Sequence, residues 1–96
     1  MTKSRKLTDE EINERLPTVP GWQVRNGKLH RELKFPDFAA AFGFMATMAA
    51  VAESLDHHPE WFNVYSRVVI DLATHDVDGI SAKDFAWAAE VNRRLP

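Results

Sequence analysis

The chain of 96 residues contains no cysteine, so it forms no disulfide and offers no thiolate for catalysis or metal binding. Its four glycines are scattered, which excludes a glycine-rich phosphate-binding loop. A formal net charge of −2 provides no positive surplus for binding nucleic acid or an anionic membrane. No apolar run approaches the roughly 20 residues that cross a bilayer, and the N-terminus does not resemble a signal peptide. We therefore expect a cytoplasmic protein that binds neither nucleic acid nor membrane.

The length predicts a single domain, residues 1–96, near the small end of the usual range. Hydrophobic residues make up 45% of the chain and charged residues 27%, which is ordinary for a globular protein. A domain of this size has a modest core, and association with further copies would bury additional apolar surface.

Three segments have the patterns of helices. Thr8 with Glu11 forms a capping box, and Ser81 with Asp84 repeats this motif near the C-terminus. Between them, apolar residues recur at spacings of three and four, which predicts a long helix from residue 37 to about residue 55. A second apolar row of this helix, which we expect to face another subunit, consists of Ala40, Phe44, Thr47 and Val51.

A first pair of strands is predicted on either side of Asn26-Gly27, because both residues tolerate the positive φ of a type I′ turn. In the second of these strands, residues 28–35, apolar side chains alternate with polar ones. His30 falls on the polar face among charged neighbours, so we expect it to be solvated and without a catalytic role.

A second hairpin is predicted over residues 61–65 and 68–74, and His75 follows the end of its second strand on the less apolar face. The complete order, α-β-β-α-β-β-α, predicts an α+β fold. In this fold a four-stranded antiparallel sheet carries the helices on one face.

Three of the four histidines lie between residues 57 and 75, and two of them are adjacent. Imidazole titrates near neutral pH, so such a cluster can both donate and accept protons. Glu53 precedes His57 by one helical turn and is expected to contact and orient it, although a plain surface pair has the same spacing. The arrangement also requires the sheet to bring His75 beside His57 and His58.

Other chemistries fit the sequence less well. Three histidines could ligate zinc, but the chain lacks cysteine and a helical His-x-x-x-His pair. We therefore expect no metal. No serine has the surroundings of a catalytic nucleophile. Trp61 and Tyr65 could stack on a flat heterocycle, although aromatic residues of a strand more often pack in the core.

The stretch Glu53–Tyr65, followed by Thr74-His75, resembles the signature of the pterin-4a-carbinolamine dehydratases. The resemblance covers close to the whole chain, because further family landmarks follow in family order. They are Phe35-Pro36-Asp37-Phe38, Ala41-Phe42-Gly43-Phe44-Met45, and Ile80-Ser81 with Asp84.

This resemblance implies the dehydration of 4a-hydroxytetrahydrobiopterin, the 4a-carbinolamine, to quinonoid dihydropterin and water. The reaction recycles the cofactor of aromatic amino-acid hydroxylases and needs no metal or cofactor of its own. An acid protonates the leaving hydroxyl and a base removes the N5 proton, which two imidazoles can do. By resemblance, His57 and His75 form the acid/base pair, His58 holds the pterin and Glu53 orients His57. The further substrate contacts that it implies are Asp56, Pro59, Trp61, Ala73 and Thr74.

The resemblance also implies a homo-oligomer, a dimer or tetramer, and functional coupling to an aromatic amino-acid hydroxylase. Phe85 stands where the family often has tryptophan, and Ala73 where animal members commonly have serine. We interpret Asp84 as a helix cap. The alternative function is a non-catalytic one, because some animal relatives act as dimerisation cofactors for a protein partner.

Overall fold

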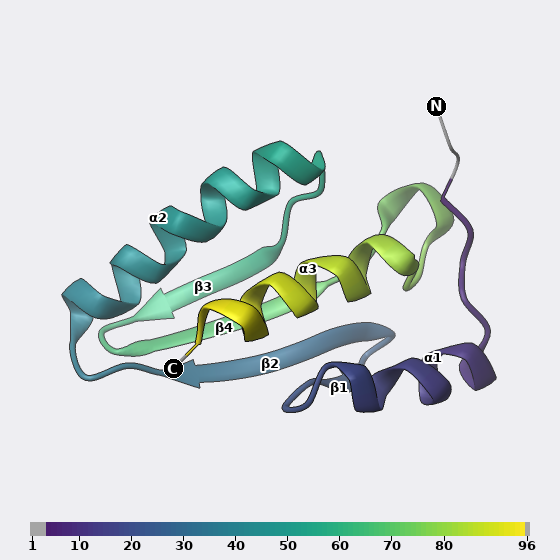
Figure 1. Ribbon diagram of the computed structural model, residues 1–96, viewed down its shortest axis with the longest axis horizontal. Helices are drawn as coiled ribbons and strands as arrows, with labels where there is room; N and C mark the ends of the chain where they lie inside the picture. The colour runs from purple at the N-terminus through teal and green to yellow at the C-terminus, as the bar shows by residue number, and fades with distance from the viewer. Residues whose placement is uncertain (1–3, 96) are drawn as a thin grey trace.

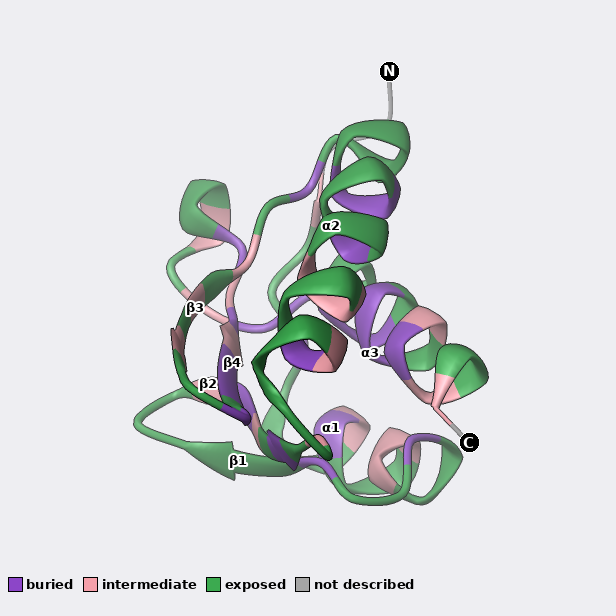
Figure 2. Ribbon diagram, turned by 90° about the vertical axis from the view of Figure 1, so that its left-hand side faces the viewer, coloured by how far each residue is buried: buried purple, intermediate pink, exposed green. Residues whose placement is uncertain are grey.

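Two β-hairpins form one four-stranded antiparallel sheet in the order β1-β2-β4-β3 (Figure 1). The computed structural model describes residues 4–95. Its helices are α1 (Asp9–Arg15), α2 (Phe38–Leu55) and α3 (Ala82–Arg94), with 3-10 turns η1 (Leu16–Thr18) and η2 (His75–Val77). Its strands are β1 (Gln23–Arg25), β2 (Lys28–Lys34), β3 (Glu60–Val64) and β4 (Arg67–Leu72). All three helices lie on one side of the sheet, so the predicted α+β class and element order are confirmed (Figure 2).

Local sequence signals set most element boundaries. The capping box of Thr8 and Glu11 begins α1, and that of Ser81 and Asp84 begins α3, as predicted. The first hairpin turns through Asn26-Gly27, whose φ angles of 53° and 76° are both positive. In the second hairpin the strand bounds differ from prediction by one or two residues, because the chain turns at Tyr65-Ser66.

The core lies between the sheet and the helices. Strands β2 and β4 turn alternate apolar residues towards it, and α2 and α3 pack onto them. Each fully buried large apolar side chain contributes roughly 1.5–3 kcal/mol relative to exposure. The largest fully buried apolar side chains of the core are Val19, Leu29, Met48, Val68, Ile70, Leu72, Trp87 and Val91.

The outward face of α2 is not the one predicted. Val51 is buried in the core, and Phe44 is partly buried against Phe35, with ring centroids 5.1 Å apart. The large apolar residues of α2 that face solvent are Phe38, Phe42 and Leu55. Phe38 and Phe42, 49% and 57% exposed, have their ring centroids 5.7 Å apart. The prediction fails for Val51 and Phe44, while Thr47 of the same row is exposed. The reason is that α2 is apolar on nearly all sides, so spacing alone does not show which stripe meets the sheet.

Within residues 4–95, α2 is also the one helix long and apolar enough to cross a membrane by length and composition. The expectation that no apolar run approaches this length is therefore corrected. The property is weak grounds for a membrane segment, because the core helix of a soluble protein has it too. Here α2 packs against α3 and the sheet through Ala41, Met48, Val51 and Ala52.

His30 lies on the helix-free face of the sheet, as expected, but it is only 6% exposed and so is not solvated. Its Nδ1 lies 2.8 Å from Oδ1 of Asp71, the residue opposite it on β4. Arg25 and Phe62, from the two outer strands, line the same depression. The prediction failed because alternation along a strand identifies the face of a side chain but not what its neighbours cover.

Candidate active site

A left-handed residue ends α2 and sends the two adjacent histidines in different directions. Asp56 has φ 50° and ψ 45°, and its N–H donates to the carbonyls of Ala52 and Glu53. The N–H of His57 donates to the Ala52 carbonyl at 3.0 Å, which closes the helix. After this turn the side chain of His57 is 10% exposed, whereas that of His58 is 58% exposed.

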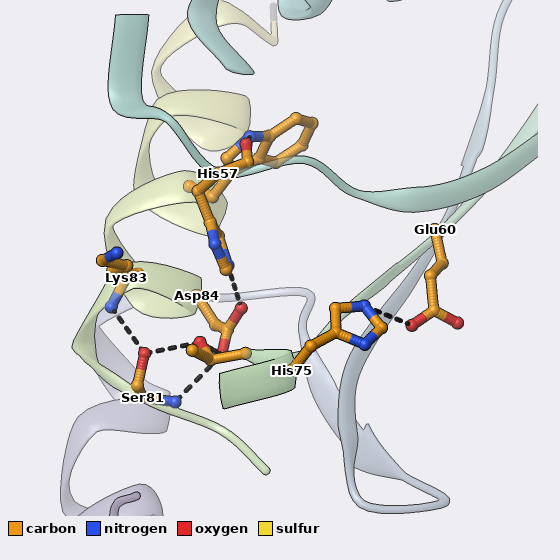
Figure 3. A network of polar contacts seen from close by, with 8 residues as sticks. His57, Glu60, His75, Ser81, Lys83 and Asp84 are labelled. Atoms are coloured by element: carbon orange, nitrogen blue, oxygen red, sulfur yellow. Dashed lines mark hydrogen bonds and ion pairs between the residues drawn. The ribbon is translucent and has the colours of Figure 1, made fainter. Parts of the chain in front are cut away.

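His57 is held by a fully buried carboxylate. Its Nε2 lies 2.5 Å from Oδ1 of Asp84, which is in the first turn of α3 (Figure 3). Both Thr74 Oγ1 and the backbone N–H of Ser81 donate to Asp84 Oδ2, each at 2.9 Å. A carboxylate offers only acceptor oxygens, so Nε2 of His57 is assigned as the nitrogen that carries a proton and donates this hydrogen bond. The second ring nitrogen, Nδ1, is therefore the one free to react.

The hydroxyls around Asp84 have a fixed direction. Thr74 uses its proton for Asp84, so the 2.6 Å contact between Thr74 Oγ1 and Ser81 Oγ takes its proton from Ser81. Ser81 Oγ in turn accepts from the backbone N–H of Lys83 at 3.2 Å. The resulting chain of hydrogen bonds runs from the start of α3 to the imidazole of His57. Asp84 thus caps the helix, as predicted, and also orients His57, which was not predicted.

An indole fixes the backbone of His57 from the opposite side. Nε1 of Trp87, which is fully buried, donates to the carbonyl oxygen of His57 at 2.9 Å. Trp61 packs edge-on against Trp87, with ring centroids 5.9 Å apart and an interplanar angle of 81°. Sequence reasoning missed Trp87, and its position on the apolar stripe of α3 was the available signal.

A depression of about 330 Å³ lies where the end of α2, the end of β4 and the start of α3 meet. It brings together six of the residues predicted to form the site and three that were not predicted. The first group is Asp56, His57, His58, Pro59, Thr74 and His75; the second is Glu60, Asp76 and Lys83. The expected convergence of the three histidines on one concavity therefore occurs.

Three predicted residues are not among those that line this depression: Glu53, Trp61 and Ala73. Trp61 is turned to the core, as described above. The predicted contact between Glu53 and His57 is wrong, because Glu53 Oε1 instead lies 3.1 Å from Nε2 of His58. Its physical cause is the left-handed Asp56, which ends the helix before His57 and so breaks the i,i+4 relationship.

His75 begins η2 and stands at the rim, with its side chain 80% exposed. Its Nε2 lies 3.7 Å from Oε2 of Glu60, and Oε1 of Glu60 accepts from Nζ of Lys28 at 2.6 Å. This hydrogen bond, with the negative charges of Glu60 and Asp71, raises the pKa of Lys28 against a smaller opposing effect of burial. The depression therefore has one buried imidazole, His57, and two exposed ones, His58 and His75, each beside a carboxylate.

Within the part of the chain that the structure describes, no three His, Asp or Glu side chains are arranged to hold a metal ion. A second depression of about 330 Å³ lies between the N-terminal segment and the start of α3. Its lining includes Arg5, Arg15 and Lys83 but no histidine. We identify the histidine-lined depression as the candidate site, because it holds groups that can transfer protons near neutral pH.

Comparison with known proteins agrees with these observations. The family model of pterin 4 alpha carbinolamine dehydratase matches residues 5–94. A relative from Solibacter usitatus, named "Putative pterin-4-alpha-carbinolamine dehydratase", is 58% identical over 87 residues, 91% of this chain and 92% of its own. A relative of the same name from Brucella ovis is 49% identical over 89 residues, with coverages of 91% and 92%.

A solved structure extends the agreement to three dimensions. The crystal structure of a transcriptional coactivator/pterin dehydratase from Brucella melitensis superposes with a TM-score of 0.89 at 48% identity. The match covers 93% of this chain and 97% of that one. Because the family model spans nearly all of the sequence and close relatives cover it at high identity, the chain belongs to the pterin 4 alpha carbinolamine dehydratase family.

Proposed function

We propose that this protein dehydrates 4a-hydroxytetrahydrobiopterin to quinonoid dihydropterin and water by histidine general acid/base catalysis. The observation that carries the proposal is the pairing of His57 with the buried Asp84 at the wall of a depression that His58 and His75 also line. Two differently placed imidazoles are what an elimination with two proton transfers requires. Family membership supplies the substrate class.

The proposed reaction breaks one C–O bond and one N–H bond. A proton moves onto the C4a hydroxyl, which leaves as water, while N5 loses its proton and its electron pair forms the C4a=N5 double bond. No electrons are exchanged with a cofactor, and one proton is taken up for each proton released. The protein has only to supply an acid for the C4a hydroxyl and a base for the N5 proton, on the two sides of the C4a–N5 bond.

The contacts of His57 limit how it can take part. Its Nε2–H is committed to Asp84, so it exchanges its catalytic proton through Nδ1. We assign the other proton transfer to His75 at the rim and the main pterin contact to His58. Asp84 acts as a positioning residue, because it holds the ring and selects its tautomer without touching the substrate.

The depression also has groups suited to the polar edge of a pterin. Its volume of about 330 Å³ lies at the small end of the range for ligand sites. Asp56 and Asp76 offer acceptors to the amino and ring N–H groups, and Lys83 offers a donor to the carbonyl oxygen. Glu53 retains an indirect role through His58.

The test is a coupled assay with an aromatic amino-acid hydroxylase that follows decay of the 4a-carbinolamine by absorbance. The wild type should accelerate this decay over the spontaneous rate. Histidine-to-alanine variants at positions 57 and 75 should lose on the order of 10²-fold or more of that acceleration. His30→Gln is the matched control, because it removes the one histidine outside the depression. A folded wild type that matches the blank would exclude this activity.

The exposed aromatic pair on α2 favours a second property. Phe38 and Phe42 form an apolar surface next to small residues of the same helix, which monomers rarely leave uncovered. We infer that a second copy of the chain covers it, giving a dimer or tetramer. Non-catalytic interaction with another protein is the alternative function. The name of the Brucella melitensis structure, which includes coactivator, is consistent with it.

A further inference from the structure

The carboxylate beside His75 is shared with a lysine from a distant strand. Glu60 is the first residue of β3, and Lys28 is the first residue of β2. Strand β4 lies between these two strands, so the Lys28 side chain crosses it to reach Glu60 on the helix-free face. The two oxygens of Glu60 have different neighbours: Oε1 binds the ammonium at 2.6 Å, and Oε2 lies 3.7 Å from the imidazole of His75.

This arrangement differs from the one around His57. Asp84 is fully buried, accepts its other hydrogen bonds from Thr74 and the backbone of Ser81, and holds its imidazole through a short hydrogen bond. Glu60 is 42% exposed, and its distance to His75 is that of an ion pair rather than a hydrogen bond. Lys28 places a positive charge against the other oxygen of the same carboxylate.

Other charged or titratable groups lie near His75, and substitutions at Glu60 or Lys28 leave all of them in place. Those that line the same depression are Asp56, His57, His58, Asp76 and Lys83. A further one, Asp71, lies opposite Glu60 on β4. Lys83 is the one lysine in this set. The cation that donates a hydrogen bond to Glu60 is Lys28.

We propose that Glu60 is the positioning residue of His75 and that Lys28 sets how strongly this carboxylate attracts the imidazolium. The relevance of this inference to catalysis rests on the proposed function, but the electrostatic interaction between the three side chains does not. Glu60 draws the ring of His75 towards the β3 end of the depression. Lys28 keeps that attraction weak.

The sign of each substitution follows from the charges. Glu60→Gln removes the attraction and leaves Lys28 as an unopposed positive charge, so His75 should titrate at lower pH. Lys28→Met leaves Glu60 unopposed, so His75 should titrate at higher pH. The double variant lacks both charges and should lie between the two single variants. Exposed charges at these distances correspond to displacements of about half a pH unit.

The experiment is an NMR titration of the His75 ring protons in the wild type, the two single variants and the double variant. Lys34→Met is the matched control, because Lys34 lies at the other end of β2, paired with Arg67. It should leave the midpoint unchanged. Salt at about 0.5 M should shrink both displacements, because it screens exposed charges. A merely structural role of Glu60 would not produce opposite, salt-sensitive displacements.

Equal midpoints in Glu60→Gln, Lys28→Met and the wild type would overturn the proposal, and so would displacements of the reverse sign. The titration uses the resting protein, so it does not depend on dehydratase activity. Opposite displacements in a protein that fails the carbinolamine assay would uphold the pair and reject the proposed function. If the wild type is an active dehydratase but neither its pH–rate profile nor the His75 titration midpoint changes in the variants, the proposed function would stand and the role of the Glu60–Lys28 pair would be rejected.

Discussion

Asp84 binds His57 through one carboxylate oxygen and caps α3 through the other. The two residues are 27 positions apart, and the short contact between them is buried. A side chain with a standard helix-capping position is therefore also the support of the candidate catalytic imidazole. Substitutions at this residue should affect helix stability and proton transfer together, and the two effects can be separated.

Asp84→Asn should lower kcat on the order of 10²- to 10⁴-fold with a smaller change in KM. All three partners of Asp84 are donors, so the amide NH2 group must face one of them. His57 can accommodate it only by moving its proton from Nε2 to Nδ1. Steady-state kinetics in the carbinolamine assay provide the measurement.

Glu11→Gln is the control for Asp84→Asn, because Glu11 has the same capping-box position in α1. It should weaken its helix and leave kcat unchanged. Equal kcat values for Asp84→Asn and the wild type would show that the carboxylate contributes only as a cap.

Trp87→Phe should cost about 1–3 kcal/mol of unfolding free energy and also reduce activity. The substitution leaves the carbonyl of His57 without its indole donor in a buried place. Trp22→Phe is matched to it, because Trp22 is also buried and also donates one indole hydrogen bond, to Asn92 Oδ1 at 2.9 Å. Urea unfolding should show a loss in both variants, whereas only Trp87→Phe should slow the dehydratase. Equal activities of Trp87→Phe and Trp22→Phe would show that the position of the His57 backbone does not affect catalysis.

The N-terminal helix should show an acid-sensitive contribution to stability. Hydrogen bonds from Arg5 and from the backbone of Thr8 lower the pKa of Glu11 from 4.5 to about 2, with Arg5 the larger cause. A depressed carboxyl pKa stabilises the fold above pH 4.5, and this contribution disappears as the pH falls towards 2. The difference in Tm between the wild type and Glu11→Gln should therefore shrink over this interval. Glu10→Gln, in the same turn, serves as the comparison, and a Tm difference that stays constant would contradict the assignment.

Phe42→Glu should dissociate the oligomer that we infer, because it places a charge within the exposed aromatic pair of α2. Light scattering after size-exclusion chromatography gives the mass directly. Ala86→Glu, on the exposed side of α3, should leave the mass unchanged. A wild type that is monomeric at micromolar concentration would refute the inference. A charge at Phe44 or Val51 would instead disrupt the core.

The parts of the structure that sequence predicted are those that depend on neighbouring residues. Both capping boxes and the Asn26-Gly27 turn need only a few adjacent positions, so their signals were sufficient. The three converging histidines followed from a resemblance that extends over most of the chain. The contact between His57 and Asp84 was missed, because it joins the end of one helix to the start of another through tertiary packing.

The errors have equally specific causes. The expected contact between Glu53 and His57 assumed that α2 continued for one more turn, whereas Asp56 adopts a left-handed conformation. No residue type in that stretch demands such a conformation, although aspartate tolerates it better than most. His30 was assigned to the correct face of the sheet but to the wrong environment. Pairing with Asp71 and burial by cross-strand neighbours are properties of the assembled sheet.

The hydrogen bonds that converge on Asp84 join the start of α3 and the orientation of the His57 imidazole into one cooperative unit. The first turn of α3 cannot fray while its capping carboxylate still holds the imidazole. Loss of activity on heating should therefore report the melting of this turn and can precede the unfolding of the sheet. Deuterium uptake at the amides of Ser81 and Asp84 would follow the same event. The temperature at which activity is lost would then report the local unfolding of this one turn.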